Sequence, residues 1–485
     1  MPEILFTHSY FLKLDPKQFR LQQPYAPLGT ITAAAYIREN GFKVSLHDSM
    51  FCNGPEDILS VIEKAKPGYL VIYDDGFNYL TKMCLTNMRK AAFKLIETGK
   101  KFGCKVIVSS SDATDHYADY LGIGADFVIS GEAELTLLHL LKSIENRDNN
   151  YQCIDGLFYM ESGRIVKTEA RQVMQDIDSL PIAAWDLVDI EMYRSKWIKK
   201  YGYFSINMAT TRGCPYKCNW CAKPIYGNRY NSRSPENVVN ELVYLRNKTG
   251  FDHVWFCDDI FGLKPGWIKD FDALSTEKGL NFRYKIQSRA DLLLKGNTLE
   301  FLSHSGCETI WMGVESGSQK ILDAMDKGIK VGQVYEATKQ IKALNMKAAF
   351  FLQFGYMGET REDIAKTIEM LLELMPEDIG ISVSYPLPGT KFYEKVRHEL
   401  STKANWTDSN DLAMMFRNTY QTKYYRRLHR TVHKKFRKRQ ALSALKSIFR
   451  QLKRPDLISL YKAASILYYI PAEALASLRL RLTNG

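Results

Sequence analysis

The chain has 485 residues, which is longer than one average domain, so two or three domains are expected. No segment reaches the ~18 uninterrupted apolar residues that indicate a membrane span, and the N-terminus lacks the basic and apolar regions of a secretion signal. The nine cysteines are odd in number and mostly scattered. These features argue against a disulfide framework and predict a cytoplasmic protein with reduced thiols.

The formal net charge of +12 is concentrated near the C-terminus. Residues 412–454 contain 14 Lys and Arg and no Asp or Glu, whereas the residues before 412 carry 49 basic and 52 acidic side chains. The main body is therefore slightly acidic, which argues against general binding of polyanions by that part of the chain.

The first 145 residues alternate short apolar runs with helical patterns. We expect strands at residues 4–6, 43–46, 69–73, 105–108 and 126–129, and helices at 29–40, 55–66, 80–98 and 132–144. Such alternation predicts a doubly wound, Rossmann-like α/β domain over residues 1–147. Ligands of these sheets bind at the carboxyl ends of the strands, where this chain has small and polar residues at 74–76, 109–112 and 130–132.

Residues 148–200 are expected to form a connector that contains a hairpin at 156–159 and 163–166. Beyond it, strands are predicted at residues 205–210, 253–257, 283–288, 309–313, 347–353 and 380–385, each followed by a helical pattern. Six such units predict a partial (β/α)6 TIM-like barrel over residues 201–400, with its active site at the carboxyl ends of the strands.

Three cysteines, Cys214, Cys218 and Cys221, lie in the run Thr-Thr-Arg-Gly-Cys-Pro-Tyr-Lys-Cys-Asn-Trp-Cys after the first barrel strand. Three thiolates can hold one iron–sulfur cluster or one metal ion, but they cannot complete a four-ligand shell. A four-iron cluster held in this way keeps one iron open for a small molecule, whereas a structural site is normally closed. The alternatives are unrelated thiols or a zinc knuckle, although no second Cys or His pair follows at zinc-motif spacing.

The pattern Cys-x3-Cys-x-aromatic-Cys resembles the signature of radical S-adenosylmethionine (SAM) enzymes, and later motifs at the strand ends agree with that family in their order. The resemblance implies that the cysteines hold a 4Fe–4S cluster whose open iron binds SAM. One electron then cleaves SAM to a 5′-deoxyadenosyl radical, which removes hydrogen from an unactivated carbon. An electron donor such as flavodoxin or ferredoxin would be a partner.

The same resemblance implies a set of SAM contacts. Trp220 offers a flat ring for adenine. Asp258 and Asp259 would contact the amino group of SAM, although adjacent carboxylates can equally cap the next helix. The remaining expected contacts are Arg289 near the methionine carboxylate, Glu315, Ser316 and Gly317 after the fourth strand, and Gly355 beside adenine. For Arg289 the alternative is a structural ion pair with Asp291.

The N-terminal domain resembles the cobalamin-binding domain found in one large class of radical SAM enzymes. The resemblance rests on Pro27-Leu28-Gly29-Thr30 before an Ala-rich helix and on Gly131-Glu132-Ala133-Glu134. Many such domains supply a cobalt-ligating histidine in an Asp-x-His-x-x-Gly motif, which this chain lacks, so a bound cobalamin should have no histidine lower ligand. The alternative is a cofactor-free lid or scaffold. The contacts that the resemblance implies are Leu28, Gly29, Thr30, Asp75, Ser110, Ser111, Gly131 and Glu132.

These resemblances imply C-methylation of a small-molecule or lipid substrate as the leading function. Radical oxidative cyclisation or rearrangement is the alternative within the class. An RNA-modifying methylthiotransferase normally carries further cluster cysteines, which Cys52, Cys84 and Cys104 do not supply. A non-catalytic zinc- or RNA-binding protein is the alternative outside the enzymes.

Residues 401–485 are expected to form a basic, mainly helical C-terminal region. A basic amphipathic helix over residues 417–454 favours peripheral contact with an anionic membrane surface or a partner protein. Nucleic acid is a less favoured partner, because no RNA-binding module accompanies the segment. The alternative is a solvated helix that packs its apolar stripe on the barrel. That stripe comprises Leu428, Val432, Phe436, Leu442, Leu445, Phe449 and Leu452.

Overall fold

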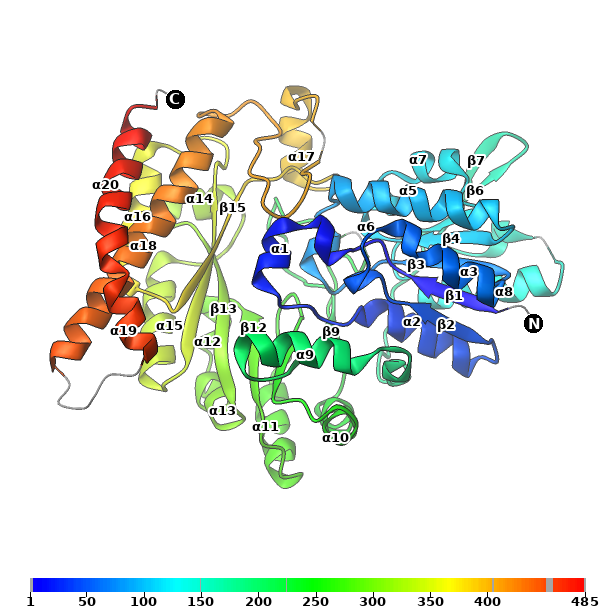
Figure 1. Cartoon of the computed structure of the whole chain (residues 1–485), viewed down its shortest axis with the longest axis horizontal. Coiled ribbons are helices and arrows are strands. Elements are labelled where there is room, and N and C mark those ends of the chain that lie inside the picture. Colours follow the sequence, from blue (N-terminus) through cyan, green and yellow to red (C-terminus); the bar gives the residue numbers. More distant parts are fainter. Residues whose placement is uncertain (1–2, 149, 224, 404, 451–456, 484–485) are drawn as a thin grey trace.

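The computed structural model describes residues 3–148, 150–223, 225–403, 405–450 and 457–483 (Figure 1). Two sheets organise these residues, with the N-terminal sheet at one end of the molecule and the C-terminal helices at the other. The predicted combination of a doubly wound domain, a partial barrel and a helical C-terminal region is confirmed.

The N-terminal sheet has the strand order β2-β1-β3-β4-β5-β6-β7. Its first five strands are parallel, and β3 is buried along its whole length because helices cover both faces of the sheet. One core lies beneath α2 and α8, and the other beneath α3, α5 and α7. The parallel strands are β1 (Ile4–Thr7), β2 (Val44–His47), β3 (Tyr69–Tyr73), β4 (Lys105–Ser109) and β5 (Phe127–Ile129); the helices are α2 (Leu28–Glu39), α3 (Leu59–Ala65), α5 (Thr86–Lys101), α7 (Tyr117–Ile123) and α8 (Glu134–Glu145).

Two details of this domain differ from the expectations. The helix expected at 80–98 is split into α4 (Tyr79–Lys82) and α5, because Cys84 between them adopts a left-handed conformation with φ 52°. The hairpin of β6 (Leu157–Glu161) and β7 (Arg164–Lys167) pairs with β5 in antiparallel fashion. The sheet therefore continues past the expected boundary at residue 147 into the connector.

The second sheet is a six-stranded parallel half-barrel with the order β15-β14-β13-β12-β11-β8. The strand expected at 205–210 ends at Met208, because Thr211 and Arg212 pair instead with Asn231 and Ser232 in a short antiparallel ribbon. The six strands are β8 (Ser205–Met208), β11 (His253–Phe256), β12 (Arg283–Ser288), β13 (Cys307–Glu315), β14 (Lys347–Phe354) and β15 (Asp378–Val383); the ribbon is β9 (Thr211–Arg212) and β10 (Asn231–Ser232).

Helices cover the outer face of the half-barrel, and an N-terminal segment lies along its open side (Figure 1). Tyr25, from the segment after α1 (Pro16–Leu21), packs on Trp197 of α9 (Ile190–Tyr201) and on Trp255 of β11. The outer helices are α10 (Pro235–Thr249), α11 (Trp267–Glu277), α12 (Ala290–Leu293), α13 (Thr298–His304), α14 (Gln319–Ala324), α15 (Val331–Ala343) and α16 (Arg361–Leu374).

Helix α17 (Lys391–Val396) follows the last barrel strand, and the C-terminal region contains, beyond residue 421, α18 (Thr422–Arg450), α19 (Leu457–Ala464) and α20 (Ile466–Arg481). Leu428, Val432 and Phe436 of α18 are fully buried, so this part of the apolar stripe packs in the protein core as the alternative interpretation expected. Nothing is described for the side chain of Phe449, and Leu452 lies outside the described residues. None of the helices in the described ranges combines the length and hydropathy of a bilayer-crossing segment.

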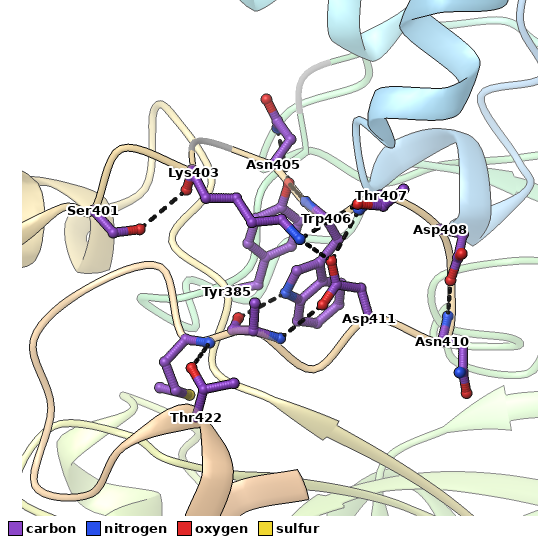
Figure 2. Close-up of polar contacts among 12 residues, drawn as sticks. Tyr385, Ser401, Lys403, Asn405, Trp406, Thr407, Asp408, Asn410, Asp411 and Thr422 are labelled. Atoms are coloured by element: carbon purple, nitrogen blue, oxygen red, sulfur yellow. Dashed lines mark hydrogen bonds and ion pairs between the residues drawn. The ribbon is translucent and has the colours of Figure 1, made fainter.

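The bridging segment, residues 401–416 without residue 404, joins the barrel to the N-terminal domain (Figure 2). Trp406 stacks on Tyr385 after β15, with ring centroids 4.4 Å apart. Asn405 donates to the Tyr385 hydroxyl at 2.8 Å and accepts from Arg89 of α5 at 2.9 Å. The Thr86 amide of α5 donates to the Trp406 carbonyl at 2.8 Å. The two domains are therefore fastened by a segment that follows both of them in sequence.

Candidate active site

The three cysteines lie in the loop between β9 and β10, at the carboxyl end of the half-barrel. Cys214 is buried, and Cys218 and Cys221 are half-buried. Burial raises the pKa of the Cys221 thiol to about 12; the Lys223 ammonium opposes this shift, and Asp259, Cys218 and Cys214 add to it. The three thiols are therefore close enough to interact electrostatically.

Among the described residues, no three His, Cys, Asp or Glu side chains converge closely enough to hold a metal ion. The loop thus gathers the three thiols without forming a chelating triad, and their role as cluster ligands stays a prediction. Their donor chemistry fits a thiolate-ligated iron–sulfur cluster.

Asn219, between the second and third cysteines, fixes the loop on the barrel. The side chain is 3% exposed, and its amide donates to the Ala324 carbonyl at 2.7 Å and accepts from the Tyr356 hydroxyl at 2.9 Å. Its backbone N–H donates to Met325, and its carbonyl accepts from Phe392. Every polar group of Asn219 is therefore used to hold the loop in place.

Gly213 precedes the first cysteine at φ +81°, a left-handed conformation. A Cβ atom there would collide with the carbonyl oxygen of Arg229, across the base of the loop. Only glycine satisfies both constraints.

Trp220, the expected adenine contact, is half-buried, and its indole N–H has no acceptor within the part of the chain that the structure describes. A buried donor without a partner is costly in a native structure. The residue therefore has both a flat ring and a free donor beside the cysteines, which fits a heterocyclic ligand.

The two adjacent aspartates serve different partners. Asp258 is buried and accepts four hydrogen bonds from the amides and hydroxyls of Thr210 and Thr211, while burial raises its pKa to about 6. Asp259 forms an ion pair with Lys82 of α4 at 2.7 Å, across the domain junction. Asp258 thus supports the start of the cysteine loop, and a direct contact of either carboxylate with SAM stays a prediction.

Arg289, at the end of β12, is 4% exposed and forms an ion pair with Asp291 at 2.9 Å. It also donates to the Lys327 carbonyl at 2.8 Å, and its guanidinium lies 3.8 Å from the centre of the Tyr216 ring in the cysteine loop. The structure therefore contains the ion pair with Asp291 that was the alternative for Arg289. The guanidinium also packs on the cysteine loop through the ring of Tyr216.

The motif after the fourth barrel strand is strained and well anchored. Glu315 has φ 61°, which is uncommon for a residue other than glycine, and its carboxylate pairs with buried Lys327 at 2.8 Å. The Ser316 hydroxyl and the Gly317 amide both contact the Thr367 hydroxyl of α16. Such strain is typical of functional sites, where the surrounding structure must enforce it.

Gly355 follows β14 at φ +78°, and a side chain there would meet Met414 and Tyr425. Its amide donates to Glu359, a fully buried carboxyl group whose second oxygen has no partner among the described residues. Burial raises the pKa of Glu359 to about 8. The segment expected beside adenine is therefore held by a carboxyl group that burial keeps largely protonated near neutral pH.

The predicted cobalamin contacts at the start of α2 are joined by Asp75. Its carboxylate accepts from the amides of Leu28 at 3.2 Å and Gly29 at 3.1 Å, while the Thr30 hydroxyl donates to the Tyr73 carbonyl. These interactions fix the loop at the edge of the sheet, so the polar groups of these four residues are used within the protein.

Ser110 and Ser111 lie at the neighbouring strand end. The Ser110 hydroxyl accepts from the Ala113 amide and caps the next helix. The Ser111 hydroxyl is buried and has no hydrogen-bond partner in the described ranges. Small residues and an unpaired buried hydroxyl at this edge fit a polar ligand.

Glu132, another predicted cobalamin contact, is part of a buried ion cluster that the sequence did not predict. Arg212, two residues before Cys214, pairs with Glu132 and, at 2.7 Å, with Glu134. Tyr226, from the same cysteine loop, stacks on Phe77 of the N-terminal domain, with ring centroids 5.5 Å apart. Gly131 adjoins this loop, since a Cβ there would lie 3.6 Å from the Ile225 carbonyl. The cysteine loop therefore packs directly against the carboxyl edge of the N-terminal sheet.

The inner face of the half-barrel carries an unpaired cation. Lys285 of β12 lies over the rings of Tyr25 and Trp255, with its ammonium 5.2 and 5.3 Å from their centres. Burial lowers the pKa of Lys285 to about 8, and no described carboxylate forms an ion pair with it. On the same face, Trp311 stacks on Phe351, which is 37% exposed.

Sequence reasoning missed Asn219, Arg212, Lys327 and Lys285. Asn219 and Arg212 stand inside the cysteine motif, so their position was the available signal. The sequence contains no signal for Lys327 and Lys285, because their importance depends on which distant side chains surround them.

A model of the radical SAM superfamily matches residues 208–371, which include the cysteine loop and most of the half-barrel. Residues 208–371 therefore form a radical SAM domain. The expected 4Fe–4S cluster and SAM are thereby confirmed as its cofactor and cosubstrate, and this radical SAM protein is an enzyme.

Two curated relatives and one solved structure extend the likeness beyond that domain. An uncharacterized methyltransferase of Pyrococcus horikoshii is 29% identical over 386 residues, 78% of this chain and 80% of the relative. The hopanoid C-3 methylase of Methylococcus capsulatus is 25% identical over 83% of this chain and 72% of its own length. The cobalamin-dependent radical enzyme OxsB, solved with aqua-cobalamin bound, shares the fold with a TM-score of 0.74 at 16% identity, over 98% of this chain and 72% of that one.

Proposed function

We propose that this radical SAM enzyme C-methylates a small-molecule or lipid substrate and uses cobalamin as a second cofactor. The observation that carries the proposal is the Arg212 ion cluster. These ion pairs join the cysteine loop to the carboxyl edge of the N-terminal sheet, so both lie at the same domain junction. A radical generator and a methyl carrier must reach the same substrate, and this junction offers that arrangement.

In this proposal Cys214, Cys218 and Cys221 hold the cluster, which supplies one electron for reductive cleavage of SAM. Trp220 stacks on the adenine, and Glu315 with Ser316 and Gly317 positions the ribose or amino group of SAM. Asn219 and Arg289 keep the loop in register, and Gly213 allows its tight turn. Asp258, Asp259 and Gly355 complete the expected SAM environment.

Cobalamin would supply a methyl carrier at the carboxyl edge of the N-terminal sheet, beside the cysteine loop. The free hydroxyl of Ser111, the small residues Ser110 and Gly131, and the loop fixed by Asp75 support this assignment. The likeness in fold to OxsB extends over both domains and also supports it. The chain lacks the Asp-x-His-x-x-Gly motif, so no histidine of such a motif would hold the cobalamin.

The side chains on the inner face of the half-barrel favour one chemical class of substrate. Trp311 and Phe351 provide an apolar aromatic wall, and Lys285 provides one cation without a counter-ion. An apolar molecule that carries an acidic group would satisfy both features, because a carboxylate or phosphate would compensate the buried ammonium.

The remaining partners belong to the same proposal. A flavodoxin or ferredoxin would deliver the electron, and a lipid-like substrate would suit peripheral membrane contact through the C-terminal region, residues 417–454 included. The buried stripe of α18 leaves its basic side chains, rather than its apolar ones, for such contact.

The test is anaerobic reconstitution followed by metal and corrin analysis, and then incubation with SAM and a strong reductant. We expect about four irons and one cobalt per chain, with formation of 5′-deoxyadenosine. Transfer of the SAM methyl group would also leave S-adenosylhomocysteine. Iron without cobalt would indicate a radical enzyme that lacks cobalamin, such as an RNA-modifying methylthiotransferase, and zinc without iron would overturn the proposal.

A further inference from the structure

The outer face of the C-terminal helices exposes an unusual amount of apolar surface. Of the twenty large apolar side chains that the described residues expose, eight lie between residues 460 and 482. Leu467 is 80% exposed and Leu482 is 72% exposed, whereas single exposed apolar residues elsewhere on the molecule need no explanation. The eight residues, here named the α19–α20 face, are Leu460, Tyr461, Leu467, Tyr468, Ile470, Leu475, Leu478 and Leu482.

Within α20 the exposed residues recur at helical spacing. Leu467, Ile470, Leu478 and Leu482 are separated by three, eight and four residues, with Leu475 between them. Side chains at such spacing lie along one side of a helix. These exposed apolar side chains therefore lie along the outward side of α20.

The opposite side of α20 is firmly attached to α18. Lys438 pairs with Glu473 at 2.7 Å, the Thr431 hydroxyl donates to the Ala476 carbonyl, and Arg427 donates to the Arg479 carbonyl and the Thr483 hydroxyl. These contacts fix the rotation of α20 about its axis. Its apolar stripe therefore points away from the barrel as a result of specific bonds, and Figure 1 places this helix at the edge of the molecule.

The basic residues around the α19–α20 face favour an anionic partner. Lys462, Arg479 and Arg481 flank it, and the only acidic residue of α19 and α20 is Glu473, which is paired with Lys438. Residues 412–485 together carry 17 basic and 2 acidic side chains. A second copy of the chain would bring two such basic regions together, whereas an anionic lipid surface would neutralise them.

We propose that the α19–α20 face docks on an anionic lipid bilayer, with its leucines at the acyl boundary and the flanking basic side chains on the headgroups. Tyr461, 79% exposed, and Tyr468, 61% exposed, suit the headgroup level because their rings are amphipathic. The docking surface thus comprises α19 and α20. Helix α18 holds α20 in place and adds basic side chains to the region. The inference is independent of the reaction at the barrel.

The test is sedimentation of the full chain with vesicles of phosphatidylcholine, with and without phosphatidylglycerol. We expect binding to the anionic vesicles that falls at least about tenfold between about 50 and 500 mM salt, and weak binding to neutral ones. L467D/L478D should reduce the anionic binding by at least about tenfold. L467S/L478S, which adds no charge, should reduce it in the same direction.

The matched control is M160D/I165D, which places the same two charges on exposed apolar positions of the β6–β7 hairpin. Its vesicle binding should equal that of the wild type. Failure of the wild type to sediment with anionic vesicles would overturn the proposal. Binding by L467D/L478D and L467S/L478S that equals binding by the wild type would also overturn it. A concentration-dependent dimer in sedimentation velocity that L467S/L478S abolishes would also overturn it and assign the face to self-association.

Discussion

Arg212 donates to Glu134 at 2.7 Å across the domain junction, and both side chains are at most 4% exposed. A second carboxylate, Glu132, shares the same guanidinium. Breaking a buried ion pair by removing one partner leaves an uncompensated charge, which costs more than the pair itself contributes. This cluster therefore couples the position of the cysteine loop to the edge of the N-terminal sheet.

Arg212→Met should lower the free energy of unfolding by about 3–5 kcal/mol, because two buried carboxylates lose their cation. Without the guanidinium, burial should raise the folded-state pKa of Glu132 further. Stability then falls as pH increases, so the deficit should be larger near pH 8 than near pH 5. Urea unfolding at both pH values measures it. The exposed Arg164→Met on β7 is the control, and an equal loss in both variants would contradict the prediction.

Replacing the motif cysteines with alanine should abolish cluster binding. The triple variant C214A/C218A/C221A is expected to retain less than about a tenth of the wild-type iron after anaerobic reconstitution, since thiolates are the cluster ligands. Iron analysis and the visible absorbance of the cluster report the change. Cys153→Ala, at an exposed cysteine outside the motif, should keep the full complement. Iron retained by the triple variant would show that the ligands lie elsewhere.

Gly213→Ala should impair the cysteine loop through a steric clash as well as backbone strain. The new Cβ meets the Arg229 carbonyl, so the loop must shift and iron incorporation should fall several-fold. Gly227→Ala isolates strain alone, because Gly227 also has a positive φ but a Cβ there meets nothing within 4 Å. Iron per chain should follow the order wild type, Gly227→Ala, Gly213→Ala. The reverse order for the two variants would rule out the clash.

Glu359→Gln should flatten the pH dependence of stability. The pKa of Glu359 is raised to about 8, so the folded protein holds a proton that the unfolded chain releases above its ordinary pKa of 4.5. This contribution to stability is complete at low pH and is lost as pH rises toward 8, by up to ~1.4 kcal/mol per pH unit. Urea unfolding from about pH 5 to 8 should show the slope in the wild type and in Glu362→Gln, the exposed control on α16, but not in Glu359→Gln.

Lys285→Met should make the protein more stable. The lowered pKa of Lys285, about 8, shows that its charged form is penalised in the fold, and methionine fills similar space without charge. The expected gain is ~1–3 kcal/mol near pH 7, and it should shrink as pH rises above 8, where the wild-type lysine loses its proton. Lys278→Met at an exposed position should change little. A destabilised Lys285→Met would mean that an unseen counter-charge satisfies the ammonium.

The strands could be predicted from the sequence because parallel strands buried on both faces read as continuous apolar runs, as at 69–73 and 105–109. The cysteine loop was equally visible, since its spacing is local. The antiparallel addition of β6 and β7 was not, because pairing with β5 depends on contacts between distant segments. The partners of Asp258 and Arg289 were hidden for the same reason, as was Arg212 with Glu134, 78 residues apart.

The sequence patterns of amphipathic helices were also only partly informative. The repeat of Leu428, Val432 and Phe436 correctly indicated one apolar side of a helix, but it could not tell whether protein or solvent covers that side. The structure buries Leu428, Val432 and Phe436, whereas it exposes Leu467, Ile470 and Leu478 of α20, a helix with fewer charged residues.

The bridging segment also links residues that are far apart in the sequence. Ser409 donates to Asp15, and Asn405 accepts from Arg89, so the N-terminal domain is secured by residues that lie more than 300 positions later in the sequence. Without this segment, only the covalent connector and the direct contacts between the domains would keep them together. The junction between the domains is therefore completed by a part of the chain that is translated after both of them.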